Sequence, residues 1–390
     1  MSIYLDNSAT TKIRSEALQK YIEVSENCFG NPSSLHGMGF LAEKELDLAR
    51  KSILSSLGER MGEVIFTASG TEANNLAILG RAYSKDRYRQ GKKRIITTQG
   101  EHASVDEPLA RLEAEGFEIV RIPTRGGQLD MTILQQALDS SVILVTMMMV
   151  NNETGALYDI GAVSKIMKAK SPEAILHVDA TQSYLKIPFT KKQIGADMIT
   201  VSSHKIEGPK GVGALVIDSS VIKARGITAV TLGGGQEKGL RSGTENVPAI
   251  AAFGEAVRLG AAECAESCKS LKALRESLVK AIGDEEAFSG VTANLPASAA
   301  PHILNITLPN IKSETMLHFL SSEGIFVSSG SACSSNAAHL SSALTAFGKT
   351  DAEADCSIRI SLSKRNTEAD ISAFLEALKL GLSKLARIKR

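Results

Sequence analysis

The chain has 390 residues, of which 43% are hydrophobic, and its 44 Lys and Arg nearly balance its 43 Asp and Glu. This balance argues against a polybasic nucleic-acid surface and against an acidic tail, and the 22% of charged residues argue against intrinsic disorder. The opening residues, MSIYLDNSATTKIR, show no signal-peptide pattern, and the longest apolar run, 142–150, is too short to span a membrane. An odd number of cysteines, five, is not a disulfide framework. We therefore expect a cytoplasmic protein that binds neither nucleic acid nor membrane.

Short β-rich runs alternate with amphipathic stretches between about residues 63 and 217. Continuous apolar strands that alternate with helices are typical of a mostly parallel sheet covered on both faces. We predict a large α/β domain over residues 15–250 with a mostly parallel seven-stranded sheet. The predicted strands are 63–68, 94–98, 117–122, 142–150, 174–180, 196–202 and 212–217, and the predicted helices between them include 71–90, 104–116 and 160–169.

The pattern changes from about residue 246, where a long Ala-rich helix is predicted. The elements after it indicate a smaller α/β domain with an antiparallel sheet, formed by residues 1–14 and 251–390. The predicted elements are a helix at 248–282, a strand at 303–308, a helix at 313–323, strands at 325–329 and 357–362, and a last helix at 367–387.

Three short motifs have simpler explanations than a ligand site. The Gly-Lys-Thr at 348–350 lacks the upstream glycine of a phosphate-binding loop, and the Gly-rich stretch at 37–42 does not follow a strand as a dinucleotide site requires. Cys264 and Cys268 are one helical turn apart, but no second Cys or His pair lies near them in the sequence. We predict no metal site.

Two polar segments follow predicted strands. Lys205 stands in SSHKIEGPKG (202–211), and a partly desolvated lysine at a strand end suits a Schiff base, although a surface lysine in a turn would look similar. Asp179 stands in HVDATQ (177–182), at the ligand-binding edge of an α/β sheet. Its carboxylate is suited to a protonated ring nitrogen of a cofactor, or it caps the next helix.

Two further segments are rich in small residues. ASGTEANN (68–75) lies between a strand and a helix, where backbone N–H groups and the Thr71 hydroxyl suit an anion, although a plain helix cap looks alike. SSGSACSS (328–335) places Cys333 in a polar loop. A thiol that must reach a substrate needs such a loop, and the alternative is a loop cysteine without a function.

Together these segments resemble the cysteine desulfurases of the class V aminotransferase group, which are pyridoxal phosphate (PLP) enzymes of fold type I. The resemblance covers nearly the whole chain. It includes YLDNSATT (4–11), EHASV (101–105), VNNETG (150–155) and GGGQEKGLRSGTEN (233–246) in the family's order. The SSGSAC form resembles the iron–sulfur and nitrogenase-maturation type.

The resemblance implies a role for each matching residue. Lys205 would hold PLP covalently, His102 would stack on its ring and shuttle protons, and Cys333 would be the sulfur acceptor. Arg359 would bind the substrate carboxylate, and Asn152 would also contact the substrate. The implied cofactor contacts are Gly70, Thr71, His102, Asn152, Asp179, Gln182, Ser202, His204 and, from the neighbouring subunit of a homodimer, Thr244.

The implied reaction converts L-cysteine to L-alanine and leaves a persulfide on Cys333. The sulfur would pass to an iron–sulfur scaffold or to a tRNA-thiolating enzyme. Two alternatives are a selenocysteine lyase and another class V aminotransferase, and the aminotransferase would form a keto acid without needing Cys333. A third alternative is a non-catalytic member of the family that binds no PLP.

Overall fold

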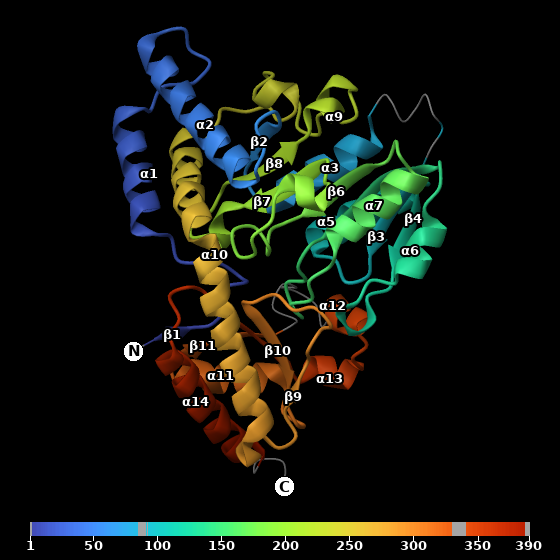
Figure 1. Cartoon of the computed structure of the whole chain (residues 1–390). Helices are drawn as coiled ribbons and strands as arrows, with labels where there is room; N and C mark the ends of the chain where they lie inside the picture. The colour runs from blue at the N-terminus through green and yellow to red at the C-terminus, as the bar shows by residue number, and fades with distance from the viewer. Residues whose placement is uncertain (1, 85–90, 92, 330–340, 387–390) are drawn as a thin grey trace.

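The computed structural model describes residues 2–84, 91, 93–329 and 341–386, and its largest element is a sheet of seven strands (Figure 1). The strands lie in the order β2-β8-β7-β6-β5-β3-β4, and only β8 runs antiparallel to its neighbours. The predicted mostly parallel seven-stranded sheet is confirmed. The strands are β2 (Glu63–Thr67), β3 (Arg94–Thr98), β4 (Glu118–Ile122), β5 (Val142–Met148), β6 (Ile175–Asp179), β7 (Met198–Ser202) and β8 (Gly213–Ile217).

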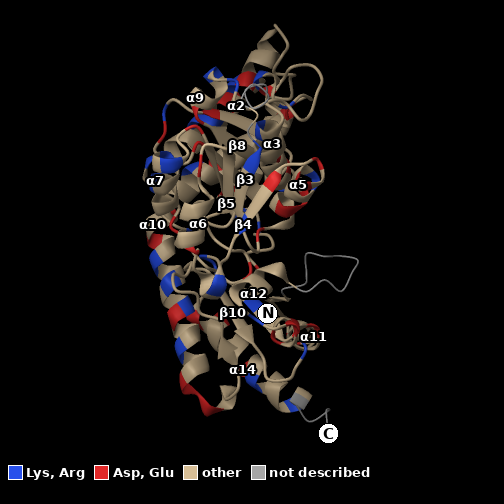
Figure 2. Ribbon diagram, turned by 90° about the vertical axis from the view of Figure 1, so that its right-hand side faces the viewer, with Lys and Arg blue, Asp and Glu red and all other residues tan. Residues whose placement is uncertain are grey.

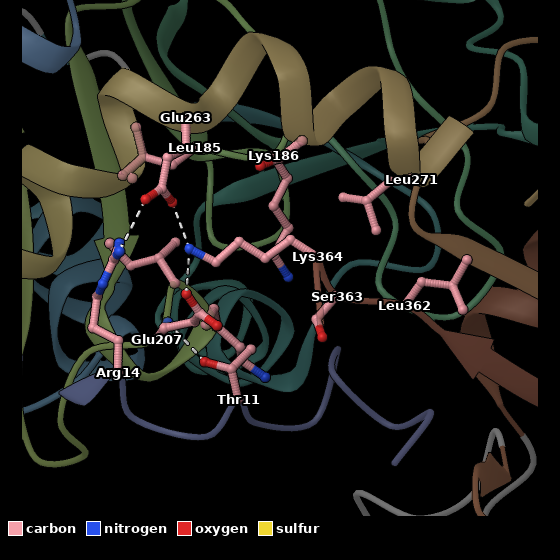
Figure 3. A pocket seen from close by; sticks show the side chains of 14 residues that line it. Thr11, Arg14, Leu185, Lys186, Glu207, Glu263, Leu271, Leu362, Ser363 and Lys364 are labelled. Atoms are coloured by element: carbon pink, nitrogen blue, oxygen red, sulfur yellow. Dashed lines mark hydrogen bonds and ion pairs between the residues drawn. The ribbon is translucent and has the colours of Figure 1, made fainter. Parts of the chain in front are cut away.

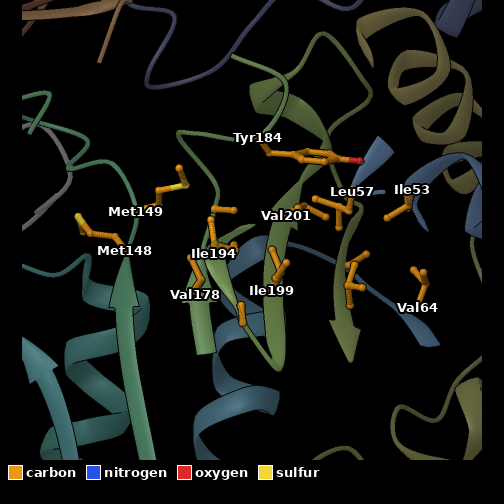
Figure 4. Packing of buried hydrophobic residues seen from close by; sticks show 14 of the residues in the cluster. Ile53, Leu57, Val64, Met148, Met149, Val178, Tyr184, Ile194, Ile199 and Val201 are labelled. Carbon is orange, nitrogen blue, oxygen red and sulfur yellow. The ribbon is translucent and has the colours of Figure 1, made fainter. Parts of the chain in front are cut away.

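Helices cover both faces of this sheet because successive strand residues point to opposite sides. Ile65 packs with α3 (Gly70–Ala82) and α5 (Ala103–Ala114), whereas its neighbours Val64 and Phe66 belong to the cluster on the other face. Figure 4 shows part of that second cluster, in which Tyr184 and Leu57 lie over the strands. The helices that contribute to it include α2 (Gly37–Ser56), α7 (Ile160–Lys170) and the first part of α10 (Val247–Asp284).

A second, antiparallel sheet has its own hydrophobic cluster, in the lower half of Figure 1. The long helix α10 joins the two clusters, since Phe253 packs under the large sheet and Leu278 under the small one. The small-sheet strands, in spatial order, are β12 (Ser328–Ser329), β13 (Ser357–Ser361), β10 (Ile303–Thr307) and β9 (Thr292–Ala293), and the helices on them are α11 (Ser313–Ser322) and α14 (Glu368–Ala386).

The N-terminal segment runs between the two sheets. β1 (Ile3–Tyr4) pairs in parallel with β11 (Ile325–Phe326), and Asp6 forms a bridge with Ser361 of the small sheet. The Thr11 N–H then binds the carbonyl of His204, next to the large sheet, before α1 (Ser15–Asn27) packs on α10, which also packs on α2. This path brings N-terminal backbone to the seam between the sheets.

The remaining helical segments are short. None of the helices in the described part of the chain combines the length and apolar character that crossing a bilayer requires. Basic and acidic residues are interspersed along α10 (Figure 2). The short segments are α6 (Met131–Ala137), α8 (Lys191–Ile194), α9 (Ser219–Lys223), α12 (Ser342–Phe347), α13 (Asp351–Asp355), and the 3-10 turns η1 (Arg125–Gly127), η2 (Ser203–Lys205), η3 (Glu237–Gly239) and η4 (Glu286–Phe288).

Two predicted elements differ from the structure. The helix predicted over 71–90 ends at Ala82, where the Tyr83 N–H caps the Leu79 carbonyl, and residues 85–90 lie outside the described part. The strand predicted over 325–329 is two strands with different partners, because β11 pairs with β1 and β12 with β13.

Candidate active site

A cavity of about 290 Å³ lies at the carboxyl ends of the parallel strands. Ligands of open α/β sheets bind at this edge, because loops that follow neighbouring strands converge there. The cavity brings together most of the residues that the sequence predicts as a site: Gly70, Thr71, His102, Asn152, Asp179, Gln182, Ser202, His204, Lys205 and Arg359.

Lys205 ends the 3-10 turn that follows β7. Its Nζ donates hydrogen bonds of 2.5 Å to the Ser8 carbonyl and 2.7 Å to the Ala9 carbonyl. The side chain is partly buried and lines the cavity. The N-terminal segment therefore helps to orient the amine.

Asp179 is the last residue of β6 and is 6% exposed. Its Oδ2 accepts a 2.8 Å hydrogen bond from Asn74 Nδ2, and its Oδ1 accepts one of 2.9 Å from the Thr181 N–H. Each carboxylate oxygen keeps a further lone pair for a donor in the cavity. The residue is thus suited to a protonated ring nitrogen.

His102 caps the N-terminus of α5, where its Nδ1 accepts a 3.1 Å hydrogen bond from the Ser104 N–H. Burial lowers the pKa of His102, the charge of Lys205 acts in the same direction, and Asp179 opposes both. The imidazole is therefore disposed to stay neutral beside the cavity.

The N-terminus of α3 forms one end of the cavity. Ser69 caps this helix by accepting a hydrogen bond from the Glu72 N–H, and the exposed backbone N–H groups and helix dipole favour an anion. Gly70 is the first helical residue, and a Cβ there would lie 3.2 Å from the Cβ of Ser202. Burial, reinforced by neighbouring lysines including Lys205, lowers the pKa of His204 to about 4. Small residues and neutral donors thus surround this end.

Arg359 of β13 reaches the cavity from the small sheet. Its guanidinium donates a hydrogen bond of 2.6 Å to Asp6 and one of 3.0 Å to the Asn152 carbonyl. Its buried Nε has no hydrogen-bond partner among the described residues. Gln182 donates to the Ser8 carbonyl at 2.9 Å, and its buried Oε1 also lacks a partner there. Both unpaired atoms are buried within the wall of the cavity.

Two predicted site residues do not join this cavity. Thr244 is exposed in the loop before α10 and does not line the cavity, so its predicted role depends on a second subunit. Cys333 lies outside the described residues. Within the described part of the chain, no group of three or more His, Cys, Asp or Glu is arranged to hold a metal ion.

Sequence reasoning missed several residues that shape the site. The carbonyls of Ser8 and Ala9 hold Lys205, and the side chains of Asn74 and Ser104 lie between Asp179 and His102. All four stand within the motif segments already singled out. The signal that could have found Asn74 and Ser104 is their helical position, one turn or less after the predicted N-termini.

A smaller pocket is also lined by Lys205 (Figure 3). Glu263 and Glu207 bind the cations around it, since Glu263 pairs with Arg14 and with Lys364, and Lys364 also pairs with Glu207. The buried side chain of Lys186 lines this pocket as well.

Comparisons with known proteins show the family to which the chain belongs. The sequence model of the aminotransferase class-V family matches residues 3–374. A NifS/IcsS protein homolog of Lactobacillus delbrueckii subsp. bulgaricus is 40% identical over 382 residues, which is 96% of each chain. Cysteine desulfurase IscS of Escherichia coli is 38% identical over 390 residues, which covers 99% of this chain and 94% of that one.

Solved structures show the same fold. A NifS-like protein superposes with a TM-score of 0.89 at 34% identity, covering 98% of this chain and all of the other. A NifS-like protein from Rickettsia africae gives a TM-score of 0.86 at 34% identity, covering 98% of this chain and 100% of that one. These likenesses confirm the expected fold type I. Since the family model spans nearly the whole sequence, the chain belongs to the aminotransferase class-V family.

Proposed function

We propose that the protein is a PLP-dependent cysteine desulfurase that releases L-alanine from L-cysteine and passes the sulfur to Cys333. The observation that carries the proposal is the convergence of Lys205, Asp179, His102 and Arg359 on one cavity. An amine, a carboxylate and a guanidinium in this arrangement suit an aldehyde cofactor with a ring nitrogen and an amino acid substrate.

The cavity fits the cofactor in three respects. Gly70 leaves the space at the N-terminus of α3 that a phosphate needs, since a Cβ there would crowd Ser202 and Thr181. Asp179 has lone pairs free for the pyridine nitrogen, and Lys205 supplies the amine. Gln182 is a further polar side chain at the cavity wall.

Each side chain then has a defined task. When bound, PLP acts as an electron sink for the charge that forms at the substrate Cα. Asp179 holds the ring nitrogen protonated, and Lys205 Nζ takes the proton from Cα. Arg359 binds the substrate carboxylate through its guanidinium, which Asp6 and the Asn152 carbonyl keep in place.

The sulfur step balances without an added oxidant. The thiolate of Cys333 attacks the substrate sulfur, the Cβ–S bond breaks with its electron pair staying on the substrate carbon, and protonation yields L-alanine and a Cys333 persulfide. The described residues on both sides of the 330–340 segment adjoin the cavity wall. Ser328 pairs with Arg359, and Ser341 hydrogen-bonds to Glu153, which follows Asn152.

The same proposal includes a homodimer, with Thr244 serving the partner's phosphate site, and a sulfur acceptor such as an iron–sulfur scaffold or a tRNA-thiolating enzyme. It also assigns residues 15–250 to a cofactor-binding domain, and residues 1–14 and 251–390 to a small domain. Two separate hydrophobic clusters support this division, whose boundary falls within α10.

The test measures alanine and persulfide sulfur formed from L-cysteine by the PLP-loaded protein. We expect equal amounts of both, and we expect both to be lost in Cys333→Ala but kept in Cys268→Ala, which removes a half-buried thiol on α10. Persulfide formation that persists in Cys333→Ala would contradict the assignment of Cys333 as the sulfur acceptor. Keto acid formation in place of alanine would identify an aminotransferase instead.

A further inference from the structure

Three hydrogen bonds connect Asp179 to His102 through two other side chains. Asn74 Nδ2 lies 2.8 Å from Asp179 Oδ2 and 2.9 Å from Ser104 Oγ, and Ser104 Oγ lies 2.8 Å from His102 Nδ1. Asn74 and Ser104 are 1% and 6% exposed. Water therefore competes little for these bonds, and the connection is a built feature of the cavity wall.

The donors and acceptors of this connection can be assigned. Asp179 accepts, so the amide nitrogen of Asn74 must face it, and the second amide hydrogen points to Ser104 Oγ. The Ser104 hydroxyl accepts that bond and keeps its own hydrogen for His102 Nδ1. Each of the four connected atoms then has a partner of the right kind, whereas the buried Oδ1 of Asn74 has none among the described residues.

The backbone fixes the tautomer of the histidine. The Ser104 N–H lies 3.1 Å from His102 Nδ1 and, being an amide, it can only donate. Nδ1 is therefore an acceptor and carries no proton, so the proton of the neutral ring is on Nε2. An imidazolium would set an Nδ1–H against this amide N–H and would break the helix cap.

We propose that Asn74 and Ser104 are positioning residues that hold His102 as the neutral, Nε2-protonated tautomer. His102 then meets the cofactor as a stacking ring and hydrogen-bond donor, not as a proton acceptor. This inference rests on the proposed function, since His102 is a cofactor neighbour only if the cavity binds PLP.

The charges around the ring agree with a neutral state. The charged groups that act on His102 are Asp179 on β6 and Lys205 after β7, and they oppose each other. Burial outweighs both and lowers the pKa of the imidazole. The two donors to Nδ1 add to this effect, because hydrogen bonds to the neutral form of a base disfavour its protonation.

The decisive experiment reads the protonation of each ring nitrogen by NMR of the protein labelled with ¹⁵N-histidine. The signals of His102 are identified by their absence from the spectrum of His102→Gln. Spectra are recorded from about pH 6 to 9, with and without PLP. For the native sequence we expect a proton on Nε2 alone throughout. In Ser104→Ala and Asn74→Ala, we expect roughly five- to tenfold more imidazolium at pH 6, the effect of losing one hydrogen bond.

Two further variants separate positioning from general stability. Ser104→Thr keeps the hydroxyl and should restore the native spectrum. Asn294→Ala removes a buried amide that donates 2.6 Å to Asn305 Oδ1 and 2.9 Å to Thr307 Oγ1 in the small sheet. This variant should lower the free energy of unfolding about as much as Asn74→Ala does, and it should leave the His102 signals unchanged.

Three results would overturn the inference: a proton on Nδ1 in the native protein, ordinary titration of His102 near its usual pKa, or equal spectra for Asn74→Ala and Asn294→Ala. Ser104→Ala alone decides the matter if Asn74→Ala does not fold, since it leaves the backbone cap of α5 intact. The spectra need no turnover, so they are readable even if the protein has no desulfurase activity.

Discussion

Lys186 is a buried amine beside the candidate active site, and its Nζ has no hydrogen-bond partner among the described residues. It lines the smaller pocket in Figure 3 together with Lys205 and Glu207. Burial lowers the pKa of Lys186 to about 7, and the charges of Lys205 and Arg359 act in the same direction. The protonated amine therefore costs stability in the folded state.

We predict that Lys186→Met stabilises the protein in a pH-dependent way. Between about pH 7 and the usual lysine pKa of 10.5, the unfolded chain binds the proton and the folded chain does not, so this group's contribution to stability rises with pH. Below pH 7 the amine is protonated in both the folded and the unfolded chain, so the cost of burying its charge no longer changes with pH. The gain in unfolding free energy should be about 3 kcal/mol larger at pH 6 than near pH 9.5. Urea unfolding at both pH values measures this.

The matched control is Lys165→Met, which changes an exposed lysine on α7 and should leave stability nearly unchanged at both pH values. A Lys186→Met variant that loses stability at pH 6 would mean that the ammonium is paired in the folded protein. The prediction of a costly unpaired amine would then be wrong.

The predictability of single site residues depended on whether their chemistry lies in the side chain. Lys205 and Asp179 were predicted because each follows an apolar strand within a polar segment, and the cavity contains both. The carbonyls of Ser8 and Ala9 were not predicted, because every residue has a carbonyl and only the path of the chain decides which one meets Lys205. Asn74 acquires its partners only when α3 packs beside α5.

At the scale of elements, the N-terminus of α3 lies where the ends of three strands meet. β2 leads into the helix, and a Cβ on Gly70 would lie 3.2 Å from Ser202 Cβ at the end of β7 and 3.3 Å from Thr181 Oγ1 after β6. Such distances require the neighbours to shift by a few tenths of an ångström. The backbone N–H groups offered to an anion would then move.

We predict that Gly70→Ala weakens PLP binding by about tenfold, because misplaced donors lose charge-assisted hydrogen bonds to the phosphate. Titration of the apo protein with PLP, followed by absorbance, measures the change. Gly37→Ala is the matched control, since Gly37 also opens a helix and its added Cβ would meet nothing within 4 Å. An unchanged affinity for PLP in Gly70→Ala would mean that the phosphate does not bind at the N-terminus of α3.

Long elements were predictable from sequence, and short paired elements were not. The strands of the large sheet lie within two residues of their predicted bounds, because most of them form apolar runs buried on both faces. The pairing of β1 with β11 joins two-residue strands more than 300 residues apart, and no local pattern indicates such a partner. The split of 325–329 into two strands follows from that pairing.

At the scale of the whole molecule, exposed apolar side chains gather on the segments around α2 and on the loop before α10. Arg50 and Glu237 join these two regions through a 2.6 Å ion pair. Large exposed apolar surfaces are typical of interfaces, and Thr244 is exposed in the same loop. This supports the proposed homodimer. The exposed apolar residues are Phe29, Leu35, Phe40, Met61, Val230 and Leu232.

Thr244 gives the dimer proposal a test by subunit complementation. Thr244→Val and Lys205→Ala should each impair both sites of their own homodimer. In a mixed dimer, the chain that keeps Lys205 receives an intact Thr244 from its partner, so one of the two sites is complete. Random pairing makes half of the dimers mixed, and we expect about a quarter of native alanine formation after co-refolding. Lys205→Ala mixed with Asp179→Ala is the control and should recover nothing, because both residues line the cavity of one chain. Recovery no greater than the sum of the separate variants would place the action of Thr244 within its own subunit.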